Sequence, residues 1–169
     1  MAAELFVIIV LPALLALAAG WDLGSYTIPN FLQVALIAAF LVFVFASGMT
    51  PGMVADHLLA GFLGLVVGFT LFALGYIGGG DAKLFACVVL WFGFHDLVSY
   101  ALVASVLGGA LTLVLLGLRR VPLPAPLARQ HWLLRLHDER AGIPYGAALA
   151  AGAFVILPQT EIFRLAAGL

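Results

Sequence analysis

The sequence predicts an all-α membrane protein, built as a bundle of six transmembrane helices within one domain that covers residues 1–169. Hydrophobic residues make up 65% of the chain and charged residues only 9%. The mean hydropathy of +1.22 lies far above the range of soluble domains. The lipid bilayer is therefore its expected surroundings, and a net charge of −1 gives no overall field that would attract nucleic acid.

Charged and helix-breaking residues separate six apolar stretches, each predicted to be one helix. No basic residue precedes the first stretch, which favours a retained span over a cleaved signal peptide. The fourth has roughly 16 residues, which rise about 24 Å and fall short of the hydrocarbon core of about 30 Å, so one of its ends should be recessed. The predicted helices cover about 5–20, 31–46, 58–77, 80–95, 97–118 and 145–159.

Small residues recur at every fourth position in the third and fifth stretches. This spacing lets helix backbones approach closely, so we expect both stripes to be helix–helix contacts in a compact bundle. The stripes are Ala60, Gly64 and Gly68, and then Ala101, Ser105 and Gly109.

Basic residues predict the orientation of the chain in the membrane. Five of the seven Lys and Arg residues fall in a loop at about 119–142, which the positive-inside rule places in the cytoplasm. Within this loop, residues 127–140 are expected to form an interfacial helix. Counting back through alternating crossings, the connections that hold Asp22 and Asp81 also face the cytoplasm, and both termini face outside. Only Arg164 departs from the charge asymmetry.

The two carboxylates Asp22 and Asp81 lie at the margins of apolar stretches. Ionisable groups near hydrocarbon are costly and by default indicate a functional site. If they share a site they cannot both ionise easily, so the pair holds one proton and supplies an acid and a base together. The ionised member can take a proton from water as it attacks a peptide carbonyl, while the protonated member donates to the carbonyl oxygen.

Other hydrolytic motifs are missing from the sequence. It contains neither H-E-x-x-H nor G-x-S-x-G, and its histidines have no metal-ligand spacing, so we predict no metal and no cofactor. The single cysteine, Cys87, lies in an apolar run and is expected to serve packing. The glycines before Asp81 are expected to adopt unusual backbone angles or to let a substrate strand come close to the carboxylate.

Structural roles remain open for several of these polar residues. Asp22 could be a helix cap or a solvated loop residue. Lys83 is two positions from Asp81 and points to another side of a helix, which favours anchoring at the phosphate level. The pairs at 56–57 and 95–96 are expected to be caps or solvated helix ends on the outer face.

Three motifs resemble those of the type IV prepilin peptidases, within them the short form associated with Flp-type (tight-adherence) pili. Asp22 stands several residues ahead of an I-P-N sequence at 28–30, as in the family's first motif. Residues 78–84, GGGDAKL, match the G-x-G-D signature, and residues 142–146, GIPYG, are similar to the P-Y-G that opens the last helix. The resemblance implies that Asp22 and Asp81 are catalytic, and that the substrate is bound or the site shaped by Gly78, Gly79, Gly80, Lys83, Pro29, Asn30, Pro144 and Tyr145.

The resemblance also implies an activity and a location. The chain would be an intramembrane aspartyl endopeptidase of the bacterial cytoplasmic (inner) membrane, cutting the leader peptide of a prepilin after a glycine at the cytoplasmic face. Its partner would be the prepilin, with its leader and N-terminal helix. Longer relatives carry an insert with paired C-x-x-C motifs and also methylate the new N-terminus. This sequence has neither the insert nor the paired cysteines, which leaves methyl transfer unsupported.

Two other functions stay open at this point. Paired membrane carboxylates also serve proton relays, so Asp22 and Asp81 could belong to a proton-coupled transporter or channel subunit. Such sites favour the bilayer midplane, whereas both aspartates are predicted to lie toward one face. A protease of the presenilin type would instead cut within a transmembrane helix.

Overall fold

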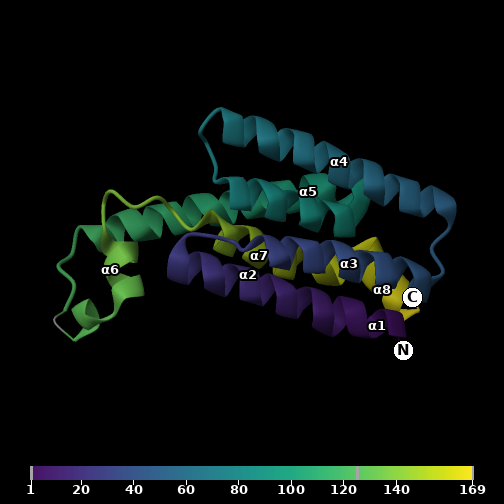
Figure 1. Ribbon diagram of the computed structural model, residues 1–169, viewed down its shortest axis with the longest axis horizontal. Helices are drawn as coiled ribbons and strands as arrows, with labels where there is room; N and C mark the ends of the chain where they lie inside the picture. Colours follow the sequence, from purple (N-terminus) through teal and green to yellow (C-terminus); the bar gives the residue numbers. More distant parts are fainter. Residues whose placement is uncertain (1, 125, 169) are drawn as a thin grey trace.

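The computed structural model describes residues 2–124 and 126–168, whose regular elements are all helices, with no strand among them (Figure 1). The long helices lie side by side along the longest axis of the molecule, and α6 lies apart at one end. The elements are α1 (Ala2–Leu5), a π-helical turn η1 (Phe6–Val10), α2 (Leu11–Ser25), α3 (Asn30–Ser47), α4 (Pro51–Ala73), α5 (Gly79–Arg119), a 3-10 turn η2 (Leu127–Arg129), α6 (His131–His137), α7 (Tyr145–Ile156), a 3-10 turn η3 (Leu157–Gln159) and α8 (Glu161–Ala167).

Four helical segments in the described residues are long and apolar enough to cross a membrane, which gives a multi-pass membrane protein. They are Ala3–Ser25, α3, α4 and α5, and the pair of Tyr145–Gln159 and α8, bent by 51°, could supply a fifth span. The predicted all-α membrane class is therefore confirmed, but the predicted count of six is not. The difference arises because the fourth and fifth predicted helices both fall within α5, whose backbone leaves helical geometry at Gly93 (φ 70°, ψ −176°).

Helix α5 folds back on itself at Gly93. The rings of Phe85 and Tyr100 stack with centroids 5.7 Å apart, whereas fifteen residues of straight helix would separate them by about 22 Å. We call residues 79–92 the first arm of α5 and residues 94–119 its second arm. The Phe94 N–H at the start of the second arm donates to Asp56 Oδ2 of α4 at 3.1 Å, so a carboxylate from another helix caps the arm.

The first arm packs along α4, as the small-residue stripe of α4 predicts. A Cβ added to Gly68 would lie 2.9 Å from the carbonyl oxygen of Ala82, and one added to Gly61 would lie 2.9 Å from the Leu90 Cβ. The glycines therefore let the two backbones nearly touch. The turn at Gly93 lies against Asp56, more than a helical turn inside the start of α4 at Pro51, so the first arm is recessed at that end.

The prediction of the contact face of the second arm is wrong, because a neighbouring face of the helix packs against α7. A Cβ at Gly109 would meet nothing within 4 Å, whereas one at Gly108 would overlap the ring of Tyr145. On α7, a Cβ at Gly152 would lie 2.9 Å from the Ala104 Cα. The contact face with α7 therefore carries Ala104 and Gly108, because the fold-back at Gly93, and not the spacing of small residues, sets the rotation of this arm.

In the polar pairs at the end of the bundle near Gly93, the aspartates cap helices. Asp96 Oδ2 accepts from the Glu161 N–H at 3.1 Å and so caps α8, while His57 is buried and its Nδ1 lies 2.9 Å from the Leu90 carbonyl oxygen. The predicted capping role is confirmed for Asp56 and Asp96, although Asp96 and His57 are buried rather than solvated. The buried Cys87 serves packing, as predicted.

At the opposite end, the basic loop folds against the bundle. The buried Arg119 donates to the carbonyl oxygens of Leu136 and Gly142, both at 2.8 Å, and Arg135 donates to the carbonyl oxygen of Ser25 at 3.1 Å. The helix predicted at 127–140 is shorter, because Gln130 is extended between η2 and α6, and Asp138 is extended after α6. This loop and the last turn of α2 thus lie together.

Candidate active site

Asp22 lies in the last turn of α2 and is only 3% exposed. The helix ends at Ser25, and Tyr26 follows in the left-handed conformation (φ 57°) with its N–H donating to the Asp22 carbonyl oxygen at 2.8 Å. Such a residue after the last helical one closes a helix and reverses the chain. Asp22 is therefore a buried side chain on a helix and not a solvated loop residue.

Asp81 lies in the first turn of α5 and is 9% exposed. Its Oδ2 accepts from the Gly78 N–H at 3.2 Å, an N-capping contact in which a carboxylate at N3 reaches back to the residue before the helix. The sequence predicted unusual backbone angles in the glycine run, but none of these three glycines has a positive φ. A Cβ at Gly78 would lie 2.9 Å from Asp81 Oδ2, so Gly78 matters for the close approach of the carboxylate.

The two carboxylates line one cavity of about 300 Å³ between the ends of α2 and α5. The first turn of α7 joins them: the Ala147 N–H donates to Asp22 Oδ2 at 3.3 Å, and the Gly146 N–H interacts with both carboxylates. The first amides of a helix have no partner within it and carry partial positive charge, so they favour carboxylates in this position.

The remaining predicted site residues divide between this cavity and its surroundings. Gly79, Gly80, Asn30 and Lys83 line it. Lys83 Nζ donates to Asn30 Oδ1 at 2.9 Å, so this lysine links α5 to α3 at the exposed edge of the cavity instead of extending freely to the phosphate level.

Three predicted residues do not line the aspartate cavity. Pro29 precedes α3 and Pro144 precedes α7, each as the capping residue. Tyr145 lines a second cavity, of about 200 Å³, on the other side of Asp81. The structure therefore places these residues where they shape the helix ends around the site.

Sequence reasoning missed several residues of the site. Tyr26, Thr27 and Ile28 line the aspartate cavity, and Gly146 and Ala147 contribute amides. The P-Y-G motif pointed to Gly146, but nothing local shows that a main-chain amide 124 residues after Asp22 will meet it. Burial raises the pKa of the Tyr26 phenol above its ordinary value, so the group stays protonated and can donate to the Arg135 carbonyl oxygen.

No three His, Cys, Asp or Glu side chains within residues 2–124 and 126–168 converge on a point that could bind a metal ion. What the site offers chemically is a pair of buried carboxylates beside a cavity, held by main-chain amides from two helix starts. Together with the apolar helices, this defines a multi-pass membrane protein with a pair of buried carboxylates near one end of its bundle.

Comparison with known proteins assigns the family. Residues 9–113, which include both aspartates, match the type IV leader peptidase family, and the chain belongs to it. It is also similar to the prepilin leader peptidase/N-methyltransferase of Bacillus subtilis (strain 168), with 36% identity over 132 residues, 72% of this chain and 50% of that protein. The chain thus spans about half the length of this curated relative. No solved structure gives a significant match.

Proposed function

We propose that the chain is an intramembrane aspartyl endopeptidase that removes the leader peptide of type IV prepilins of the Flp type, cutting after a glycine at the cytoplasmic face of the membrane. The observation that carries the proposal is that Asp22 and Asp81, far apart in sequence, line one cavity beside the first turn of α7. Family membership supports a prepilin leader as substrate. The Flp-type assignment rests on the motifs around the two aspartates.

The chemistry needs one proton shared by the two carboxyl groups. The ionised aspartate takes a proton from a water molecule while the water oxygen bonds to the scissile carbonyl carbon. The protonated aspartate gives its proton to the carbonyl oxygen, which forms a tetrahedral diol. When the diol collapses, the C–N bond breaks, the leaving amine receives the proton taken from water, and the diol proton returns to the aspartate that donated it.

The surrounding backbone holds the carboxylates ready for these transfers. Main-chain N–H groups of Gly78 and Ala147 each bond one carboxylate oxygen, at 3.2 and 3.3 Å, so neither side chain must be reoriented during the reaction. Donors fixed in this way in a buried site act more strongly than in water and cost no rearrangement at the moment of reaction. The alternative of a proton-coupled transporter is not favoured by the family to which the chain belongs.

Six crossings with the site at the cytoplasmic face are part of the proposal. The two arms of α5 run in opposite directions, so α2, α3, α4, the two arms and α7 with α8 amount to six passes. Arg119 and Arg135 bond main-chain atoms beside the ends of α7 and α2, which supports one common side for the basic loop and the aspartates. The positive-inside rule then assigns that side to the cytoplasm of a bacterium, at its inner membrane.

The test is cleavage of a Flp-type prepilin by the purified protein in liposomes, with Asp22→Asn and Asp81→Asn. Each change keeps the shape of the side chain and removes half of the acid–base pair, so we expect a loss of at least about 100-fold in rate. Asp96→Asn is the matched control, because Asp96 is also buried but caps α8 at the other end of the bundle. Near-normal processing by either site variant would rule out the aspartyl mechanism.

A further inference from the structure

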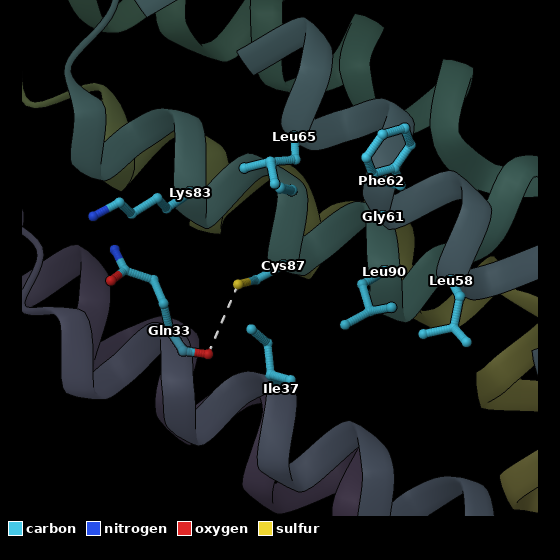
Figure 2. Close-up of a pocket in the computed structure, with 10 residues that line it drawn as sticks. Gln33, Ile37, Leu58, Gly61, Phe62, Leu65, Lys83, Cys87 and Leu90 are labelled. Atoms are coloured by element: carbon cyan, nitrogen blue, oxygen red, sulfur yellow. Dashed lines mark hydrogen bonds between the residues drawn. The ribbon is translucent and has the colours of Figure 1, made fainter. Parts of the chain in front are cut away.

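A groove lies along the first arm of α5, between α3 and α4 (Figure 2). Its volume is about 260 Å³. Lys83 lies at one end of the groove and also lines the aspartate cavity, so the groove adjoins that cavity at Lys83. Apart from this end the lining is apolar, with Ile37 from α3, Phe62 and Leu65 from α4, and Leu90 from α5.

Gln33 of α3 is a polar group in this apolar lining, next to Lys83 (Figure 2). It is 5% exposed. Its Nε2 donates to the carbonyl oxygen of Gly80 at 3.4 Å, which fixes the orientation of the amide, because the reverse orientation would set two oxygens against each other. Gln33 Oε1 is buried and, among the described residues, has no hydrogen-bond partner.

A buried acceptor without a donor is unfavourable and usually marks a group whose partner is absent. The missing partner of Gln33 must bring an N–H or O–H group to an apolar groove. An acyl chain of a lipid would fill the groove but has no donor. An apolar peptide helix fills the groove and also has free donors, but only at its start, because its first four N–H groups are unpaired whereas its last four unpaired groups are carbonyl acceptors.

We infer that the groove between α3 and α4 holds the apolar helix that follows the scissile bond of the substrate, and that Gln33 Oε1 accepts a main-chain N–H from the first turn of that helix. This inference rests on the proposed function. It also fixes the direction of the substrate: Gln33 touches Gly80, the neighbour of Asp81, so the start of the apolar helix lies beside the carboxylates and the leader lies on the other side of them. Gln33 is then a substrate-positioning residue and not a catalytic one.

Removing the acceptor, Gln33 Oε1, should lower kcat/KM by the same factor as removing the donor N–H from the substrate. Removing both should lower it no further. The probe is a semisynthetic Flp-type prepilin in which one main-chain amide, at the second, third or fourth residue after the cut, is replaced by an ester that lacks the N–H. One net hydrogen bond corresponds to roughly 2- to 12-fold in kcat/KM. We expect the ester at one of these positions to cost the wild-type protein this factor, and Gln33→Met to lose the same factor with the all-amide substrate.

Non-additivity between the Gln33 variants and the ester substrates separates a direct contact from an indirect structural effect of the mutation. In Gln33→Met the ester at the sensitive position should cost nothing further, whereas Gln33→Glu, which keeps an acceptor oxygen, should remain sensitive to it. Thermal unfolding of Gln33→Met should stay close to that of the wild type, because the variant removes an unpaired buried acceptor together with the long hydrogen bond to Gly80. Independent, multiplying losses at all three ester positions would overturn the inference.

Crosslinking locates the helix directly. With Asp81→Asn to keep the substrate uncut, p-benzoylphenylalanine at Leu65 in the groove should crosslink to the apolar helix of the prepilin. The same group at Leu71 of α4 is the matched control, because Leu71 lines the cavity on the other side of Asp81. Crosslinking mainly from Leu71, or crosslinks from Leu65 to lipid alone, would overturn the inference.

The outcomes also separate the inference from the proposed function. If the wild-type protein does not cut the all-amide prepilin, the proposed function fails and the inference fails with it. If the prepilin is cut but neither the coupling nor the Leu65 crosslink is found, the groove assignment fails alone and the peptidase assignment stands.

Discussion

Gly146→Ala should impair cleavage although it changes no titratable group and touches no part of the substrate. A Cβ at this position would lie 2.9 Å from Asp22 Oδ2, 3.1 Å from Asp22 Cγ and 2.6 Å from Ile28 Cδ1. The Ile28 methyl can rotate away. The carboxylate cannot easily do so, because it is bonded by the Ala147 N–H of the same helical turn.

The size of the effect follows from these distances. Non-bonded contacts of carbon are most favourable at about 3.5 Å, so the carboxylate must move by roughly 0.5 Å. A displacement of about 1 Å of a catalytic group can cost on the order of 100-fold in rate, and half that displacement about 10-fold. Helix propensity acts in the opposite direction, since alanine is more favourable than glycine within a helix by roughly 0.5–1 kcal/mol. Reduced activity with unchanged or raised stability is therefore the expected signature.

The assay is initial-rate cleavage of the prepilin in liposomes, with processed and unprocessed chains separated by mass, alongside thermal unfolding of the same preparations. Gly24→Ala is the matched control: Gly24 is two residues from Asp22, and an added Cβ there meets nothing within 4 Å. Wild-type rates in Gly146→Ala would refute the idea that the first turn of α7 holds Asp22 in place.

Two further predictions concern packing and topology. Gly68→Ala should destabilise the protein by about 1–3 kcal/mol, because its Cβ would meet the Ala82 backbone at 2.9 Å. Gly109→Ala should not, because its Cβ would meet nothing within 4 Å. Unfolding in detergent measures both variants, and equal stabilities would contradict the close packing of α4 on α5. A cysteine in place of Arg129 in the basic loop should react with an impermeant thiol reagent only from the cytoplasmic side. Gly52→Cys at the exposed start of α4 should react only from outside. Labelling of both cysteines from the same side would contradict the proposed number of crossings.

Much of the site could be predicted from the sequence because its signals are local. A carboxylate at the margin of an apolar stretch is costly wherever the chain goes, so Asp22 and Asp81 could be identified without a fold. The proposed side of the membrane rests on the position of the arginines, which is also read directly from the sequence. Gln33 carried a signal of the same kind, a polar side chain within an apolar stretch, and was missed because it bears no charge.

What the sequence determined by itself is the class of the protein, the two aspartates at the margins of its apolar stretches and the family motifs around them, since hydropathy and short motifs depend only on neighbours along the chain. Tertiary structure decided the rest. The reversal of α5 lies at Gly93 because that backbone turns against Asp56 of another helix, and it rotates the second arm so that Gly108 and not Gly109 faces α7. The amides of α7 meet Asp22 only through contacts between chain segments more than 100 residues apart, and no local pattern encodes such a distance.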